Sequence, residues 1–183
     1  MLYTGKGDGG TTTIFGCKQR ISKNSSRVEA LGALDELNSL LGISKVLSRK
    51  CDWKIEGETP EQMMESIQQN LFIIQAELAG AEKTVTEEKL RKAEKIIGAI
   101  EKEIPPLTSF SISGGTELSA SFDYARAVSR RAERRVILAI EEEQVTMGKF
   151  SRAYLNRLSS LLFALARVSN TKSGISEKKP SYS

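Results

Sequence analysis

Apolar residues spaced three and four positions apart are the feature that most restricts the fold of this chain. Val28, Leu31, Leu34 and Leu41 show this spacing, which places them on one face of a helix. Four later stretches repeat the pattern, and Ser, Thr, Gly or Pro residues mark most of their ends. No stretch convincingly predicts a strand. We therefore expect helices over residues 26–48, 60–81, 86–104, 117–144 and 149–169.

The length of the chain agrees with a single helical domain. A chain of 183 residues is long enough for one sizeable core. Five helices with short connections predict an all-α fold, an up-and-down five-helix bundle with a glycine/threonine-rich N-terminal loop. The domain is expected to span residues 1–170, with residues 1–25 as the loop region. Residues 171–183 contain few apolar side chains and are expected to be disordered.

The N-terminal loop has an unusual composition. Five glycines and four threonines lie between Thr4 and Gly16, together with Lys6 and Asp8. Glycine permits left-handed backbone conformations, and successive N–H groups in such turns form a concave anion site. The segment therefore predicts a phosphate cradle or, at even odds, a flexible chain end. It does not match the Walker pattern, because its lysine comes early and no strand precedes it.

Arginines gather on one side of the fourth expected helix. Arg126, Arg130 and Arg134 are four residues apart and form one row, while Arg131 and Arg135 lie on a neighbouring face. Guanidinium groups bind phosphate oxygens in a bidentate manner, so the row predicts an anion site. A solvated basic face paired with acidic residues is the alternative. Aromatic residues do not alternate with the arginines, which disfavours a base-stacking surface for nucleic acid.

The apolar residues of this fourth helix are predicted to face the core. Polar residues interrupt the apolar pattern of the first and fifth helices. The expected core face comprises Leu118, Phe122, Ala125, Val128, Ala132, Val136 and Ile140. Asp35 and Asn38 interrupt the apolar pattern of the first helix, and Asn156 and Arg157 lie in the fifth. Ordinary solvent-facing positions explain these residues equally well. Together they suggest that polar groups from three helices converge.

The chain contains no histidine, which limits its chemistry. A Ser-His-Asp triad, a Cys-His pair and a histidine-ligated zinc site are excluded. Cys17 and Cys51 match no disulfide framework or zinc pattern, and no protein residue is assigned as a metal ligand, although a metal held by oxygen ligands stays open. The net charge of +4 is modest, and no apolar run approaches the length of a membrane span. We expect a cytoplasmic protein with neither a membrane nor a nucleic-acid partner.

Several segments together resemble one family, the all-helical ATP:cob(I)alamin adenosyltransferases. Order and spacing agree over about residues 3–169. The matching segments include Gly7-Asp8, Gly10-Thr11-Thr12, Asp35-Glu36-Leu37-Asn38-Ser39, Arg130-Arg131-Ala132-Glu133-Arg134 and Asn156-Arg157-Leu158-Ser159.

The resemblance implies a reaction and an assembly. Co(I) of cob(I)alamin would attack the 5′ carbon of ATP, and triphosphate would leave. No protein base is needed, which agrees with the absence of histidine. The family likeness also implies a homotrimer with active sites between subunits, with Mg²⁺ bound beside ATP. A corrinoid reductase would supply Co(I), and a cobalamin-dependent mutase would receive adenosylcobalamin.

The resemblance also assigns residues to the site. Asp35 would pair with Arg130 across the subunit boundary, and these two are the implied catalytic residues. Phe110 would lie beside the corrin and help to displace its lower axial ligand. The triphosphate would be held by Thr4, Gly5, Lys6, Gly7, Thr12, Thr13 and Lys23. The nucleotide site would be completed by Arg130, Arg131, Ala132, Glu133, Arg134 and Asn156.

Two alternatives stay open. A helical-bundle module that binds an anionic partner such as RNA would also use the arginine row. A catalytically inactive ATP-binding relative is the other, because Ser160 stands where the family commonly has an aspartate.

Overall fold

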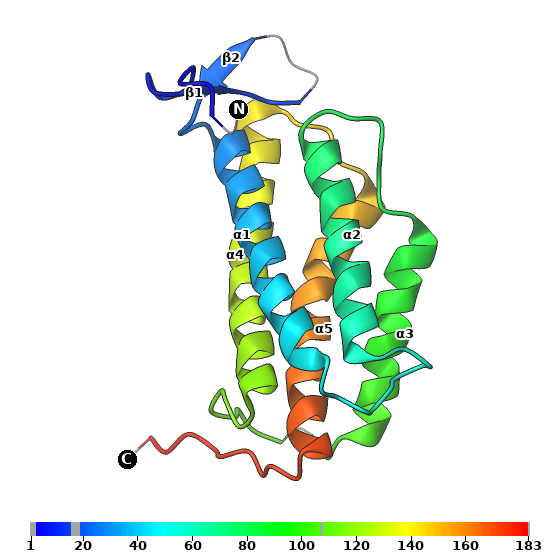
Figure 1. The fold of residues 1–183 in the computed structure, drawn as a ribbon. Coiled ribbons are helices and arrows are strands. Elements are labelled where there is room, and N and C mark those ends of the chain that lie inside the picture. The colour runs from blue at the N-terminus through cyan, green and yellow to red at the C-terminus, as the bar shows by residue number, and fades with distance from the viewer. Residues whose placement is uncertain (1–2, 16–18, 107, 183) are drawn as a thin grey trace.

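Five helices form an up-and-down bundle in the computed structural model, which describes residues 3–15, 19–106 and 108–182 (Figure 1). Helix α1 packs against α2 and α4, and α5 packs against α3 and α4. The predicted all-α fold class is therefore confirmed. The helices are α1 (Ser26–Ser48), α2 (Pro60–Leu78), α3 (Glu87–Glu103), α4 (Glu117–Glu143) and α5 (Lys149–Lys172).

Local capping explains where the helices begin. The Ser25 side chain accepts a hydrogen bond from the Val28 N–H, which identifies Ser25 as the N-cap of α1. Thr59 and Gln62 form a reciprocal capping box at the start of α2. Helix α2 ends three residues earlier than predicted, because the chain turns at Gly80 with φ 97°.

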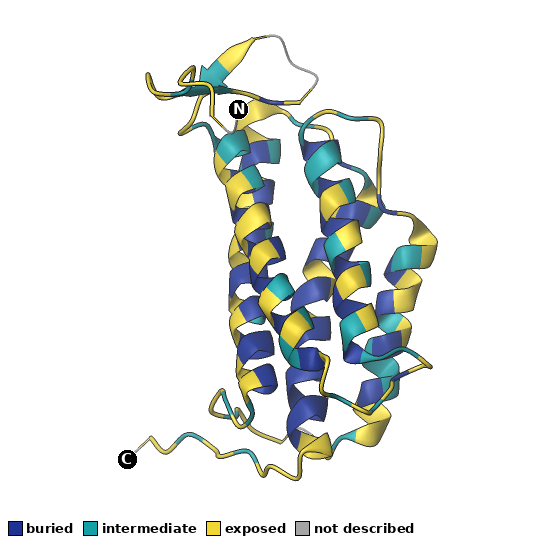
Figure 2. Cartoon of the chain, viewed as in Figure 1, coloured by how far each residue is buried: buried dark blue, intermediate teal, exposed yellow. Residues whose placement is uncertain are grey.

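The core lies between the helices, and α5 is buried along most of its length (Figure 2). The predicted core face of α4 is confirmed from Leu118 to Val136, while Ile140 is half-buried. In the part of the chain that the structure describes, no helix is both long enough and apolar enough to span a membrane.

The N-terminal loop contains two short strands, so the expectation of no strand was wrong. Strand β1 (Thr11–Thr13) pairs antiparallel with β2 (Arg20–Ser22), with Thr12 opposite Ile21. Ile14, directly after β1, is buried and borders a hollow together with Leu31 of α1 and Phe72 of α2. The pair lies at the end of the bundle where α1 begins (Figure 1).

The segment after α5 has contacts that its composition did not predict. Helix α5 continues three residues beyond its expected end and stops before Gly174, whose φ is 68°. The chain then runs beside the connection between α3 and α4, where the Ile112 N–H donates to the Lys178 carbonyl at 2.8 Å. The amino-acid composition shows that this segment contains few apolar residues, but it does not predict the hydrogen bond that joins the segment to the connection between α3 and α4.

Candidate active site

The N-terminal loop forms a series of tight turns. Gly5 and Gly10 adopt left-handed backbone conformations, with φ of 67° and 78°. The Asp8 N–H donates to the Gly5 carbonyl at 3.2 Å, and the Gly10 N–H donates to the Gly7 carbonyl at 3.1 Å. The loop is therefore a folded, glycine-dependent structure of the kind that presents backbone N–H groups to anions.

Arg20 holds this loop together, and the sequence analysis missed it. Its guanidinium donates to the Lys6 carbonyl at 2.5 Å, the Thr11 carbonyl at 2.7 Å and the Thr11 hydroxyl at 2.8 Å. The one sequence feature that could have indicated this role is that an arginine closely follows the glycine-rich loop, whose backbone carbonyl groups can accept hydrogen bonds from it. Lys23 also belongs to the loop, because its Nζ would lie 3.1 Å from a Cβ placed on Gly7.

The predicted triphosphate residues are thus brought together in part. Lys6, Gly7 and Lys23 share the turns of the loop, and the Thr4 hydroxyl accepts from the Lys6 N–H at 3.4 Å. Thr12 is half-buried and Thr13 exposed on β1.

The arginines of α4 differ in whether they are already paired. Arg130 and Arg134 are exposed, and among the described residues neither has a hydrogen bond or an ion pair. Arg131 forms an ion pair with Glu36 of α1, and Arg135 lies 3.4 Å from Glu29 of the same helix. The first pair of arginines is therefore available to an anion, whereas the second joins α4 to α1.

Ala132 does not present its side chain to this surface. It is fully buried in the core, so any contact between this residue and a nucleotide has to use its backbone. The residue was predicted both for the core face and for the nucleotide site, and the structure places its side chain only in the core.

Asn156 joins α5 to the surface formed by the arginine row. Its Nδ2 donates to Glu133 Oε1 at 3.1 Å, and its Oδ1 accepts from Arg157 at 2.9 Å. Arg157 in turn donates to Glu94 of α3 at 3.1 Å. The side-chain hydrogen bond from Arg91, assisted by Arg157, lowers the pKa of Glu94. A continuous polar network therefore links α3, α4 and α5.

Phe110 lies in the connection between α3 and α4, and the residue is 82% exposed. It borders a cavity of about 800 Å³ whose walls include Arg126, Arg130 and Phe163. The Nε of Arg126 is buried without a hydrogen-bond partner among the described residues. The cavity therefore joins an exposed aromatic ring to the arginine row.

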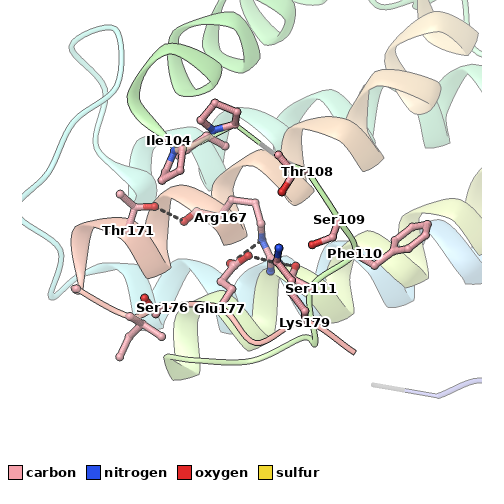
Figure 3. Close-up of a pocket in the computed structure, with 14 residues that line it drawn as sticks. Ile104, Thr108, Ser109, Phe110, Ser111, Arg167, Thr171, Ser176, Glu177 and Lys179 are labelled. Atoms are coloured by element: carbon pink, nitrogen blue, oxygen red, sulfur yellow. Dashed lines mark hydrogen bonds and ion pairs between the residues drawn. The ribbon is translucent and has the colours of Figure 1, made fainter. Parts of the chain in front are cut away.

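A second cavity also borders the Phe110 loop, residues 108–115. Its volume is about 380 Å³, and it is lined by the loop, α5 and the segment after α5. Figure 3 shows Arg167 pointing toward Ser111 and Glu177 in this cavity, with the Phe110 ring turned away from them.

The two parts of the predicted site lie far apart within one chain. The N-terminal loop lies at one end of the bundle, and the connection between α3 and α4, which contains Phe110, lies at the other (Figure 1). Helix α4 has 27 residues, so the bundle is about 40 Å long at 1.5 Å per residue. No hydrogen bond or ion pair between described residues joins the loop to Arg130, and Asp35 is exposed without such a partner.

The fold and these features define a helical bundle with a glycine-rich loop and an arginine-lined cavity. Residues 2–169 match the Cobalamin adenosyltransferase family. The chain belongs to that family.

Named relatives show the same likeness. The corrinoid adenosyltransferase of Citrobacter freundii is 38% identical over 177 residues, which cover 93% of this chain and 95% of that protein. The corrinoid adenosyltransferase of Bacillus subtilis is 38% identical over 181 residues, with 96% and 90% covered. The chain spans about half the length of the PduO corrinoid adenosyltransferases of Citrobacter freundii and Salmonella typhimurium, to which it is 36% identical.

Solved structures show the same fold. A variant PduO-type ATP:corrinoid adenosyltransferase from Lactobacillus reuteri, complexed with cobalamin and ATP, has a TM-score of 0.87 and 31% identity. The match covers 100% of this chain and 97% of that chain. A second variant, complexed with ATP, has a TM-score of 0.85 and 32% identity, with 98% and 100% covered.

Proposed function

We propose that this protein transfers the 5′-deoxyadenosyl group of ATP to the cobalt of cob(I)alamin, which yields adenosylcobalamin and triphosphate. The observation that carries this proposal is exposed Arg130, which has no ion pair among the described residues and lines a large cavity bordered by Phe110. Membership of the cobalamin adenosyltransferase family supports it.

The reaction makes limited demands on the protein. The cobalt–carbon bond forms as the bond between C5′ and the triphosphate oxygen breaks, and triphosphate keeps the electron pair. Cobalt is the nucleophile, so a chain without histidine is sufficient. The protein has to position the two substrates and stabilise the charge that develops on the leaving group.

The N-terminal loop is suited to the leaving group. Backbone N–H groups and hydroxyl groups would donate hydrogen bonds to the triphosphate, from Gly5, Gly7, Thr4, Thr12 and Thr13. Positive charge would come from Lys6 and Lys23. Arg130 and Arg134 would bind further phosphate oxygens, and Asn156 with Glu133 would complete the nucleotide site from α5.

We further propose that Mg²⁺ binds together with ATP and neutralises part of its charge. Among the described residues no group of three or more His, Cys, Asp or Glu side chains is placed to hold a metal. The phosphate oxygens would therefore provide most of its ligands, and Glu133 is the carboxylate within the arginine row. This donor set fits a cation that keeps several water ligands.

The separation of the loop from Phe110 supports a homotrimer with sites between subunits. The N-terminal loop of one subunit would approach the middle of α4 in the neighbouring subunit. At this boundary Asp35 of one subunit would pair with Arg130 of the other. Ile43 and Val46 of α1 and Phe72 of α2 are exposed apolar side chains, and their burial against another subunit would favour such association. A corrinoid reductase, a cobalamin-dependent mutase and a cytoplasmic location stay predictions.

A spectroscopic assay tests the proposal. The protein is incubated with ATP, Mg²⁺ and chemically reduced cobalamin, and the corrin absorption spectrum is followed. Formation of adenosylcobalamin with stoichiometric triphosphate is the expected result. ATP binding without product would indicate an inactive relative. RNA binding with a steep salt dependence and no corrin change would indicate a nucleic-acid module.

A further inference from the structure

We propose that Arg167 and Glu177 are positioning residues that hold the Phe110 loop, residues 108–115, against the bundle. Glu177 lies in the segment after α5, so this segment would serve as a latch on the loop. That the latched loop presents Phe110 to a corrinoid rests on the proposed function, whereas the latch itself does not.

Arg167 is the centre of the cluster. Its side chain is only 3% exposed, although it carries a permanent charge. Its Nη2 donates to Asp123 Oδ2 at 2.6 Å, and its guanidinium lies 5.0 Å from the centre of the Phe163 ring. A buried guanidinium requires such compensation, because desolvation otherwise makes it costly. The ion pair between Asp123 of α4 and Arg167 of α5 therefore holds the Arg167 side chain between the two helices.

Glu177 adds a second carboxylate to the same guanidinium. Arg167 Nη1 donates to Glu177 Oε2 at 3.0 Å, and Arg167 Nε lies 3.0 Å from Glu177 Oε1 (Figure 3). Asn170, one turn further along α5, donates to Glu177 Oε1 at 2.8 Å. The carboxylate therefore anchors the segment after α5 through two residues of that helix.

The same groups hold the Phe110 loop. Arg167 Nη1 donates to the Ser111 hydroxyl, and the Gly114 N–H donates to Asp123 at 3.4 Å. Asn170 Nδ2 donates to the Gly114 carbonyl at 2.9 Å. The loop and the segment are also joined directly, through the bond from Ile112 to Lys178 at 2.8 Å. Removing Glu177 would thus loosen both partners of that bond.

Glu177 is the contact of this cluster that can be released. Asp123 lies on α4, is 4% exposed and by itself neutralises Arg167. Glu177 lies on an irregular segment and is 21% exposed. A variant without its carboxylate therefore keeps the buried ion pair and the folded bundle. A variant without Arg167 would leave Asp123 unpaired in the core and is the poorer test.

The loop lines both cavities, so its position would matter for catalysis if the larger cavity receives the corrinoid. Phe110, Ser111 and Arg167 border both cavities. If the latch is absent, the loop samples more positions, and the ring is less often placed for the reaction. This effect should reduce turnover while it leaves the distant ATP loop unchanged.

The test compares the full chain with its Glu177→Ala variant and with Glu103→Ala as the matched control. Glu103 forms an exposed ion pair with Lys172 at the same end of α5, and no hydrogen bond between described residues joins it to the loop. Amide hydrogen exchange is measured without substrates at Ile112 and Gly114. We expect about tenfold faster exchange in Glu177→Ala and no change in Glu103→Ala. Turnover with reduced cobalamin should fall about fivefold in Glu177→Ala, with the KM for ATP unchanged.

Two results would overturn the proposal. Exchange in Glu177→Ala that equals the control, or that is already fast in the parent protein, would show that Glu177 does not hold the loop. Faster exchange with unchanged turnover would show that the latch does not position Phe110. Failure of the parent protein to form adenosylcobalamin would refute the proposed function, and the exchange measurement would still decide the latch.

Discussion

Arg20 and Lys6 are 14 positions apart, and the Arg20 guanidinium donates to the Lys6 carbonyl at 2.5 Å. The same guanidinium bonds Thr11 on β1. One side chain therefore joins the first turns of the N-terminal loop to the strand that follows. A loop that is ordered before its ligand arrives loses less entropy on binding, so we expect Arg20 to contribute to ATP affinity by ordering the loop.

Replacing Arg20 tests this role. We expect Arg20→Ala to weaken ATP binding about tenfold, which corresponds to about 1.4 kcal/mol. The helices and the thermal midpoint should change little, because the loop lies outside the core. Titration calorimetry measures the affinity. Arg49→Ala is the control, since it removes an equally charged, exposed side chain paired with Glu61 far from the loop. Equal ATP affinity in both variants would contradict the assignment.

Arg130 is predicted to act on the transition state. Loss of one donor to a developing anion typically lowers turnover about 10²–10³-fold, and we expect this for Arg130→Ala. Arg130 is exposed and has no ion pair among the described residues, so circular dichroism and the urea midpoint should stay within error of the parent. Arg152→Ala, which removes an exposed arginine from α5, controls for net charge. Unchanged turnover in Arg130→Ala would remove this residue from the mechanism.

Asp35 is predicted to act through Arg130 of a neighbouring subunit. A double-mutant cycle of Asp35→Asn and Arg130→Ala measures their coupling in turnover. If the two residues pair, the double variant should be no slower than Arg130→Ala alone. Sedimentation of each variant shows whether assembly is retained. Effects that simply multiply would indicate that the two residues act independently.

Glu143 should make stability depend on pH at acidic values. Burial raises the pKa of its carboxyl, but hydrogen bonds from the Arg27 N–H and the Ser26 hydroxyl outweigh this effect and lower the pKa below its ordinary value of 4.5. A lowered folded-state pKa stabilises the protein above the unfolded-state pKa, and this contribution disappears as pH falls through the folded-state value.

Glu143→Gln should therefore be less stable than the parent at pH 7, and the difference should shrink below about pH 4. Urea unfolding at several pH values gives the two free energies of unfolding. Glu142→Gln changes the neighbouring exposed residue and serves as the control. A difference that is constant with pH would mean that the carboxylate charge of Glu143 has no role.

Gly115 has no room for a side chain. Its φ is 117°, and an added Cβ would lie 2.4 Å from Asn170 Oδ1. We expect Gly115→Ala to lower the free energy of unfolding by about 1–3 kcal/mol through backbone strain and displacement of Asn170. Gly98→Ala is the control in α3, where a Cβ meets no atom within 4 Å and alanine should stabilise by up to about 1 kcal/mol. Urea unfolding of both variants distinguishes a steric effect from a general effect of glycine replacement.

The sequence by itself determined the five helices and the family, and it proposed the residues of the candidate site. Apolar periodicity and caps such as Thr59 act over a few residues, so they can be recognised without knowledge of the fold. The arginine row was visible for the same reason, because Arg126, Arg130 and Arg134 share a face by helical geometry alone. The family likeness then assigned residues such as Phe110 whose local sequence indicates no function.

Only the tertiary structure decided which of these groups are free and which are already paired. Arg131 pairs with Glu36, Ala132 is buried and Arg130 is exposed, although all three lie in one motif. The sequence also could not predict the hydrogen bonds from Arg20 to the N-terminal loop or the contact between Arg167 and Glu177. Such pairs depend on how helices and loops meet in space, and the free energy of each pair depends on burial, which the order of residues along the chain does not specify.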